Sequence, residues 1–220
     1  MTIKILFEDK DVLAIEKPSG VLVHPNERSK EKTVFDLFVK KYPKLQIVHR
    51  LDKETSGVML LAKNEKAHEF LKKQFQNRTI KKVYRAIVSG HMKNDHGLVN
   101  KPIGRSPSDF RRRLAGRGAR GELREAITEY KVLKRFGTSS KKFSYLEIKP
   151  KTGRTHQIRV HMKFLNHPVA CDSLYNPEGP CPQGLKRLAL HAKSIEFKNT
   201  NGKTVKVESL LPKDFQRVVK

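Results

Sequence analysis

Residues 49–64 join a turn to an apolar run, and this stretch limits the possible folds of the chain more strongly than any other. The run at residues 58–62 has the length of a strand and is followed by a helical pattern, which indicates a buried strand. Residues 55–57, Thr-Ser-Gly, predict the turn, because the hydroxyl oxygens can bond nearby backbone and the glycine can take positive φ. We therefore expect Asp52 at the mouth of a buried strand, rigidly held yet able to reach a ligand. The alternative is that Asp52 only caps the turn.

The charge of the chain indicates what kind of partner it binds. Lys and Arg number 47 against 22 Asp and Glu, which gives a formal net charge of +25. Such an excess predicts a polyanionic partner, because neutralising phosphates releases condensed counterions. Nucleic acid is the first candidate and an anionic membrane surface the second. The membrane is disfavoured, because no apolar run approaches spanning length and no amphipathic anchor opens the chain.

The cysteines and the N-terminus bear on the compartment. The two cysteines, Cys171 and Cys181, form neither a disulfide framework nor a metal set of their own. The first nine residues turn acidic too early for a signal peptide, which needs a basic start and an apolar core. We therefore expect a reducing, intracellular location, the cytoplasm.

Periodicity along the rest of the chain predicts more strands than helices. Strands are expected at residues 3–8, 11–15, 82–89, 127–132 and 143–148 and in a hairpin around Asn201-Gly202, and helices are expected to begin at Thr33, Asn64, Thr155 and Pro212. Short turns join most of these strands. The sequence therefore predicts an α+β fold with a mixed, mainly antiparallel central sheet and flanking helices, in a single domain over residues 1–220.

The segment at about 91–125 differs from its surroundings. Between residues 101 and 124 eight Lys or Arg stand against two acids, with four glycines and no apolar periodicity. This composition predicts a mobile basic loop whose arginines contact phosphates, Arg111, Arg112 and Arg113 among them. The alternative is a solvated charge run without a ligand.

Several common chemistries lack their sequence patterns. Neither Gly-x-x-x-x-Gly-Lys-Ser/Thr nor Gly-x-Gly-x-x-Gly occurs, so nucleotide hydrolysis and dinucleotide redox chemistry have no support. Gly-x-Ser-x-Gly is absent as well. Three histidines at 156, 161 and 167 have spacings that do not place them on one helix face, and no carboxylate accompanies them. We therefore expect no metal site.

Five motifs in order resemble the RluA family of RNA pseudouridine synthases. His49-Arg50-Leu51-Asp52-x-x-Thr55-Ser56-Gly57 is similar to the family's signature. The other four are Lys17-Pro18-x-Gly20, Lys82-x-Tyr84-x-Ala86, Gly153-Arg154-Thr155-His156-Gln157-Ile158-Arg159-Val160-His161 and Arg187-Leu188-x-Leu190-His191-Ala192. Together they extend from about residue 10 to 200. The resemblance implies a pseudouridine synthase catalytic fold that acts on RNA without a metal or organic cofactor. The S4-like domain of many relatives is expected to be absent, because the first motif starts at Lys17.

The reaction that the resemblance implies turns uridine into pseudouridine and requires a carboxylate. The N1–C1′ bond breaks, the uracil turns over and C5 joins C1′, so the sugar becomes electron-deficient. A carboxylate near C1′ can stabilise that charge, attack it or take the 2′ proton. Asp52 is the candidate, and Arg159 is the guanidinium expected to keep it ionised. The alternative for Arg159 is a phosphate contact on an exposed helix face.

The resemblance also implies roles for other residues. The ring of Tyr84 is expected to stack on the uracil after it is flipped from its helix, and its hydroxyl to accept a proton; the alternative is a core aromatic. Arg50 is expected to fill the vacated stack or hold the backbone, and Leu190 to form an apolar wall for the base. Supporting or backbone contacts are expected for Lys17, Arg154, His156 and His191.

Two other functions remain open at this point. One is a catalytically inactive RNA-binding or ribosome-assembly protein on the same fold. The other is a basic nuclease, which would need paired carboxylates or a metal set that the sequence does not show. The RNA is expected to be ribosomal RNA, transfer RNA or both, and the protein to be a monomer.

Overall fold

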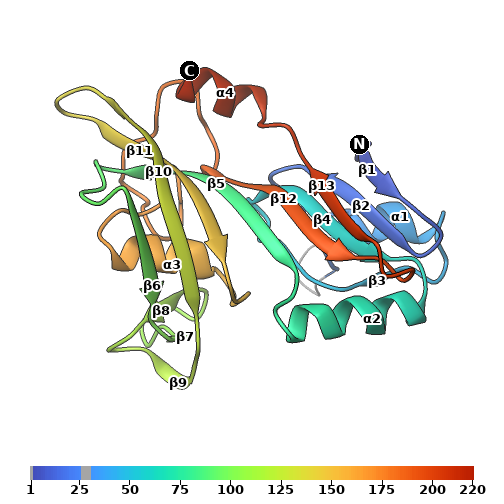
Figure 1. The fold of residues 1–220 in the computed structure, drawn as a ribbon. Coiled ribbons are helices and arrows are strands. Elements are labelled where there is room, and N and C mark those ends of the chain that lie inside the picture. Colours follow the sequence, from blue (N-terminus) through green and yellow to red (C-terminus); the bar gives the residue numbers. More distant parts are fainter. Residues whose placement is uncertain (1, 26–30) are drawn as a thin grey trace. The chain divides into compact units, whose positions relative to one another are not determined.

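The computed structural model describes residues 2–25 and 31–220, whose contacts divide the chain into two compact units (Figure 1). Unit 1 consists of the described part of residues 1–82 together with 191–210, and unit 2 of 83–190 and 211–220. Helices and mainly antiparallel strands occur in both, which confirms the predicted α+β class. Across the described ranges no helix is long and apolar enough to cross a membrane. The single domain over residues 1–220 stays a prediction.

Unit 1 is built around a mixed sheet. Its strand order is β1 (Ile5–Glu8), β2 (Val12–Lys17), β4 (Ser56–Ala62) and β12 (Leu190–Lys198), with β3 (Gln46–Ile47) on β4 and β13 (Thr204–Glu208) on β12. The pair of β4 and β12 is parallel, and the other pairs are antiparallel. The predicted strands at 3–8 and 11–15 and the hairpin around Asn201-Gly202 are confirmed.

Strand β4 forms the centre of the unit 1 core. All seven of its residues are buried, in agreement with the apolar run of the sequence. Leu60 and Ala62 pack with Val12 of β2 and with Leu71 of helix α2 (Glu65–Gln76). Burying a leucine of this kind contributes roughly 1.5–3 kcal/mol relative to leaving it exposed. The strand is therefore a rigid base for the turn that precedes it.

The two helices of unit 1 begin where the sequence predicts. Thr33 caps α1 (Val34–Val39) in a capping box with Asp36. Asn64 caps α2 through its side-chain oxygen, which accepts the Ala67 N–H at 2.9 Å. These bonds satisfy backbone donors that the first turn of a helix leaves open.

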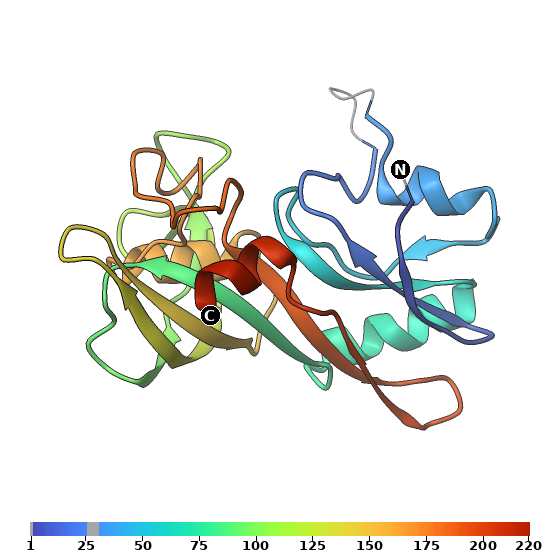
Figure 2. The ribbon, with the colours of Figure 1, turned by 90° about the horizontal axis from the view of Figure 1, so that it is seen from above.

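Unit 2 contains an antiparallel sheet with two helices. The strand order is β5 (Lys81–Ser89), β11 (Lys142–Pro150), β10 (Ile127–Gly137) and β6 (His96–Asn100), and the helices are α3 (Gln157–Phe164) and α4 (Lys213–Val219), the latter red in Figure 2. Ile158 and Met162 of α3 are buried, and Leu165, directly after the helix, is half-buried. The helix starts two residues later than predicted, because His156 takes the left-handed φ of 56°.

The basic segment at 91–125 is folded, which corrects the prediction of a mobile loop. Besides β6 it forms a small sheet in the order β8 (Arg113–Ala115), β7 (Ile103–Arg105) and β9 (Arg120–Arg124), called the basic sheet below. Ile103 and Ala115 pack with Val160 of α3 and with Tyr175. Too few apolar residues make these contacts to produce a visible period in the sequence, so the strands depend on partners elsewhere in unit 2.

The two cysteines of the chain are bonded, which corrects the expectation that they form no disulfide framework. Cys171 and Cys181 form a disulfide with Cα atoms 5.1 Å apart. The segment between them, the 171–181 loop, turns back on itself, and Cys171 takes a positive φ of 56° at its start. Two cysteines in a sequence do not indicate such a return of the chain.

Candidate active site and basic surface

The turn that carries Asp52 is held by a buried lysine. Lys17, at the end of β2, is fully buried, and its Nζ donates to the carbonyl oxygens of Lys53 at 2.8 Å, Val21 at 2.7 Å and Pro18 at 2.9 Å. Three acceptors match the three N–H groups of an ammonium. Burial lowers the pKa of Lys17 to about 7, against the attraction of nearby carboxylates. Lys17 therefore holds backbone segments together, and its expected supporting role in a site stays a prediction.

Further bonds join the first motif to the signature motif within unit 1. The N–H of Gly20 donates to the carbonyl of Lys53 at 2.9 Å, and the hydroxyl of Ser19 donates to the carbonyl of Glu54 at 2.7 Å. Gly20 has a φ of +85°, a conformation that glycine adopts without strain. Asp52 itself is half-buried, and its carbonyl accepts the Thr55 N–H at 3.1 Å. Two motifs far apart in sequence thus form one rigid turn.

The C-terminal motif meets the signature motif in the same unit. Ser56 and Gly57 pair with His191 and Ala192 in the parallel contact of β4 and β12. The Oγ of Ser56 lies 2.9 Å from Nδ1 of His191. Gly57 has a φ of +115°, and a Cβ there would collide with the carbonyl oxygen of Ala192. The glycine of the signature is therefore required by the close approach of the two strands.

His49, the first residue of the signature, has a structural role that sequence reasoning did not assign. Its Nε2 accepts the backbone N–H of Leu60 at 2.9 Å, and its ring centroid lies 4.7 Å from that of Phe75. Burial, and then the charge of Lys82, lowers the pKa of His49 to about 3. The ring is therefore neutral, as an acceptor must be. Next to it Arg50 is exposed.

Tyr84 and Leu190 belong to unit 2. Tyr84 pairs with Ile148 across β5 and β11, and its half-buried side chain packs against the core of this unit. Leu190 is 3% exposed and is part of the same core. Both residues are fixed by packing. Their expected contacts with a base stay predictions.

The start of α3 is tied to neighbouring segments by its polar residues. The side-chain oxygen of Gln157 accepts from the Thr152 hydroxyl at 2.7 Å and from the Arg154 N–H at 2.9 Å. Arg154 also donates its Nε–H to the carbonyl of Glu125 at 2.9 Å. Nδ1 of His156 lies 3.0 Å from the Tyr175 hydroxyl. These contacts define the backbone that presents the motif.

Arg159 forms a bidentate ion pair with Asp172. Its Nε lies 2.7 Å from Oδ2 and its Nη2 2.8 Å from Oδ1, and the side chains are 7% and 0% exposed. Sequence reasoning expected Asp52 as the partner of Arg159 and missed Asp172. One signal could have found it: residues 126–190 contain only four acids, and a buried guanidinium requires a carboxylate.

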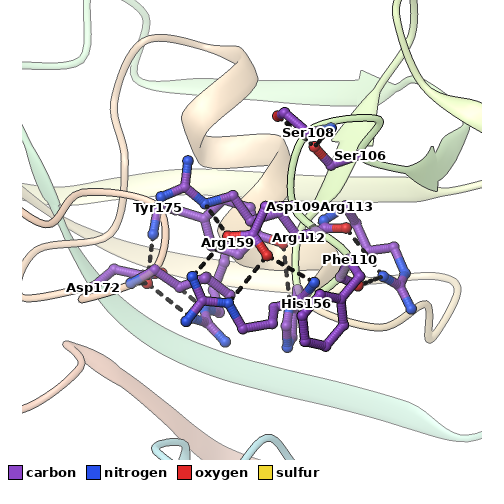
Figure 3. A network of polar contacts seen from close by, with 12 residues as sticks. Ser106, Ser108, Asp109, Phe110, Arg112, Arg113, His156, Arg159, Asp172 and Tyr175 are labelled. Atoms are coloured by element: carbon purple, nitrogen blue, oxygen red, sulfur yellow. Dashed lines mark hydrogen bonds and ion pairs between the residues drawn. The ribbon is translucent and has the colours of Figure 1, made fainter.

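The segment between β7 and β8 of the basic sheet places arginines around Asp109, which Figure 3 shows beside Arg112 and Arg113. Asp109 binds Arg111 through two bonds of 3.0 and 2.8 Å and lies 3.5 Å from Nε of Arg112. The bonds from Arg111 lower the pKa of Asp109 to about 2. Arg113 donates its backbone N–H to the Tyr175 hydroxyl at 2.8 Å. Phe110 lies beside them with 76% of its surface exposed.

The expected site residues fall into two groups by unit. Unit 1 contains Lys17, Arg50, Asp52 and His191, and unit 2 contains Tyr84, the arginines of the basic sheet, Arg154, His156, Arg159 and Leu190. Among the residues that the structure describes, no three His, Cys, Asp or Glu gather as a metal would require.

Comparison with protein families identifies the group to which this arrangement belongs. The family model for RNA pseudouridylate synthases matches residues 11–164, which include the first four motifs. The chain belongs to this family.

Individual relatives agree with the membership. A ribosomal large subunit pseudouridine synthase D of Neisseria meningitidis serogroup B is 39% identical over 235 residues, covering 100% of this chain and 61% of the relative. An uncharacterized RNA pseudouridine synthase of Aquifex aeolicus is 42% identical over 182 residues, covering 79% of this chain and 56% of the relative. The chain therefore spans about three fifths of the length of these relatives.

Solved structures of pseudouridine synthase domains resemble the fold. Human RNA pseudouridylate synthase domain containing 1 superimposes with a TM-score of 0.82 at 26% identity, covering 96% of this chain and 84% of that one. Human RNA pseudouridylate synthase domain containing 4 gives 0.77 at 27% identity, covering 98% and 91%.

Proposed function

We propose that this chain is an RNA pseudouridine synthase, an isomerase that converts specific uridines of structured RNA to pseudouridine. The observation that carries the proposal is the turn of Asp52, which the buried Lys17 ties to the 18–21 loop through one bond to Lys53 and two to Pro18 and Val21, in a chain of this family. A carboxylate fixed before a rigid strand suits a reaction in which charge develops at one carbon.

Asp52 is proposed to act at the sugar of the flipped nucleotide. As the N1–C1′ bond breaks, its electrons move to the uracil and the sugar becomes electron-deficient. The carboxylate of Asp52 either adds to C1′ or takes the 2′ proton, and the uracil then forms the C5–C1′ bond. Formation of that bond expels the Asp52 carboxylate from C1′, or the 2′ proton returns to the sugar. C5 then loses its hydrogen as a proton and N1 gains one, so atoms and charge balance and the product is an isomer of uridine.

Arg159 and Tyr84 are the other two proposed catalytic residues. The guanidinium of Arg159 favours the ionised carboxylate of Asp52. The ring of Tyr84 stacks on the uracil, and its hydroxyl accepts a proton of the reaction. Extruding the uracil from its helix costs a few kcal/mol. Arg50 is proposed to fill the space that the uracil leaves in the RNA helix, and Leu190 to support the extruded base.

The RNA is proposed to be large-subunit ribosomal RNA. The name of the neisserial relative gives this substrate for that protein. The net charge of +25 supports a polyanionic partner. We propose that Arg113 of β8 and the neighbouring Arg111 and Arg112, which precede this strand, contact its phosphates. We also propose that Arg154 and His156 support this surface, and that the protein acts as a monomer.

The cytoplasm is the proposed location. In a reducing compartment the thiols of Cys171 and Cys181 are expected to be free. The 171–181 loop then keeps its shape through Asp172, whose Oδ1 accepts the N–H groups of Leu174 and Tyr175 at 3.0 Å each.

Release of tritium from RNA labelled at uracil C5 tests the proposed function. The substrate is a transcript of large-subunit ribosomal RNA, and transfer RNA serves as the second substrate. We expect Asp52→Asn to lose more than about 10³-fold in rate while RNA affinity stays within about twofold, because a group of the reaction itself is removed. Glu54→Gln is the matched control, since it removes the same charge two residues away in the same turn.

Appreciable turnover by Asp52→Asn would overturn the assignment of the carboxylate. The product should also have the mass of the substrate, with the RNA strand intact. Strand scission would favour the nuclease, and RNA binding without tritium release the inactive RNA-binding protein.

A further inference from the structure

The guanidinium of Arg159 is held by a loop outside the motif that contains it. Asp172 of the 171–181 loop supplies both oxygens of the ion pair, and the Arg159 Cζ lies 5.0 Å from the ring centroid of Tyr175 in the same loop (Figure 3). A bidentate pair sets the plane of a guanidinium, and an aromatic face below it restricts its tilt. One loop thus defines the orientation of this arginine.

The carboxylate of Asp172 is itself fixed. Its Oδ1 accepts the backbone N–H groups of Leu174 and Tyr175 at 3.0 Å each, and its own carbonyl accepts the N–H of Asn176 at 2.8 Å. The residue is 1% exposed. Because these bonds hold the carboxylate to its own loop, Asp172 is a preorganised anchor for Arg159.

Tyr175 connects the same cluster to the basic sheet. Its hydroxyl accepts the backbone N–H of Arg113 in β8 at 2.8 Å and lies 3.0 Å from Nδ1 of His156. Its side chain packs with Ile103 of β7 and Val160 of α3. The ring of Tyr175 therefore contacts Arg159, and its hydroxyl contacts the basic sheet. A displacement of β8 would consequently move the ring that lies against Arg159.

We propose that Asp172 and Tyr175 are positioning residues, which orient Arg159 for its proposed catalytic role and join it to the basic sheet, the proposed contact surface for RNA. The inference rests on the proposed function for its kinetic part. Asp172 sets the direction of the guanidinium. Tyr175 transmits the position of β8 to it, so binding of RNA on the basic sheet and the placement of Arg159 are coupled.

A second cluster of the same composition provides the control. In unit 2 Arg187 binds Asp214 through bonds of 2.7 and 3.0 Å, and its Cζ lies 5.4 Å from the ring centroid of Phe215. The side chains of this pair are 17% and 31% exposed. This cluster also combines an arginine, an aspartate and an aromatic ring. Phe215 differs from Tyr175 because it has no hydroxyl that could bond a neighbouring strand.

Kinetics of the full chain on the ribosomal transcript test whether Asp172 orients Arg159, separately from RNA binding. For Asp172→Asn we expect kcat to fall about 10²-fold, the scale of a displacement of about 1 Å in a catalytic group, while RNA affinity stays within about twofold. Asp172→Glu keeps the charge and should lose only about tenfold. Asp214→Asn should retain the wild-type kcat. An unchanged kcat in Asp172→Asn would overturn the proposal, and if that variant does not fold, an unchanged kcat in Asp172→Glu would do so.

Tyr175→Phe tests the connection to the basic sheet. It keeps the ring over Arg159 and removes the acceptor of the Arg113 N–H. We expect RNA affinity to weaken several-fold, with at most a small change in kcat. Wild-type RNA affinity in this variant would overturn the connection.

Exchange of the Arg159 Nε–H, followed by nitrogen-15 NMR, tests the positioning without any activity. The signal is assigned by its loss in Arg159→Lys. In Asp172→Asn we expect exchange at least about tenfold faster than in the wild type, and an unchanged rate would overturn the proposal. If the wild type releases no tritium from RNA, the proposed function is wrong, and the exchange rate still decides whether Asp172 holds Arg159.

Discussion

The turn of Asp52 and the guanidinium of Arg159 are held by opposite kinds of interaction. The Asp52 turn is held by the buried cation of Lys17, whose three bonds go to neutral carbonyls, and the nearby His49 ring is neutral as well. Arg159, in contrast, pairs directly with the carboxylate of Asp172. Unit 1 thus positions its carboxylate with dipoles, and unit 2 positions its guanidinium with a charge.

The difference has a physical consequence for how each region responds to change. A lysine whose direct partners are carbonyls can lose its proton without breaking an ion pair, and burial lowers the pKa of Lys17 to about 7. A buried ion pair cannot lose one partner without exposing the other to a medium of low dielectric. We therefore expect the Asp52 turn to respond to pH and the Arg159 cluster to respond to mutation.

The largest expected effect is the loss of stability in Asp172→Ala. Removing one partner of a buried pair leaves the other charge unpaired and costs about 3–5 kcal/mol. The more exposed pair of Arg187 and Asp214 provides the contrast. Asp214→Ala should lower the free energy of unfolding by about 1 kcal/mol or less. Urea unfolding followed by circular dichroism measures both. Equal losses in the two variants would remove the distinction between the clusters.

Lys17→Met should have the next largest effect. Buried carbonyls lose their donor, and we expect a loss of about 2–3 kcal/mol at pH 7. The pKa of Lys17 is lowered by burial, so between pH 7 and its unfolded value the unfolded chain binds more protons. Stability of the wild type relative to Lys17→Met should therefore rise with pH across that window. If the difference in unfolding free energy between the wild type and Lys17→Met fell as pH rises, the pKa of Lys17 could not be lowered in the folded protein.

His49→Gln should show a smaller effect, confined to acid. Burial lowers the pKa of His49 to about 3, so its stabilising bond to Leu60 is fully present above pH 6.5 and is lost as the pH falls toward 3. The glutamine oxygen can accept the same N–H but does not titrate. The wild type should lose up to about 1 kcal/mol relative to the variant between pH 6.5 and 5.5. An unchanged difference in stability over this range would show that the pKa of His49 is not lowered in the folded protein.

The smallest effect on folding is expected for the triple variant of Arg111, Arg112 and Arg113 to Ala. Each change should alter stability by about 0.5 kcal/mol or less, because Arg111 is exposed and Arg112 and Arg113 are only partly buried. The salt dependence of RNA affinity should become shallower, by about 0.7–0.9 in log–log slope for each phosphate that is no longer neutralised. Neutralising Lys10, Lys44 and Lys66, which line a surface hollow of unit 1, is the matched control. Equal slopes in the two triple variants would show that the basic sheet has no special contact with RNA.

Features of the fold that depend on neighbouring residues could be predicted from the sequence. The apolar run at 58–62 predicted a buried strand, and Thr33 and Asn64 predicted the starts of α1 and α2. Each depends on burial or capping within a few residues, so a short window contains the information. The motif order likewise predicted the family.

The fold of the basic segment at 91–125 could not be predicted from neighbouring residues. Its strands are held by a handful of contacts, such as Ile103 with Tyr175, that join residues about seventy positions apart. The charge pattern of the segment was visible in the sequence, but its folding was not. Composition alone therefore suggested a loop where the structure has a sheet.

The sequence by itself determined the family, the buried strand that follows Asp52 and the excess of positive charge. Only the tertiary structure decided that Asp172 binds Arg159, that Tyr175 contacts the basic sheet and that Lys17 donates to three carbonyls. The reason is that a buried charge is satisfied by whichever partner the folded chain brings within about 3 Å, and that choice depends on contacts between segments far apart in sequence.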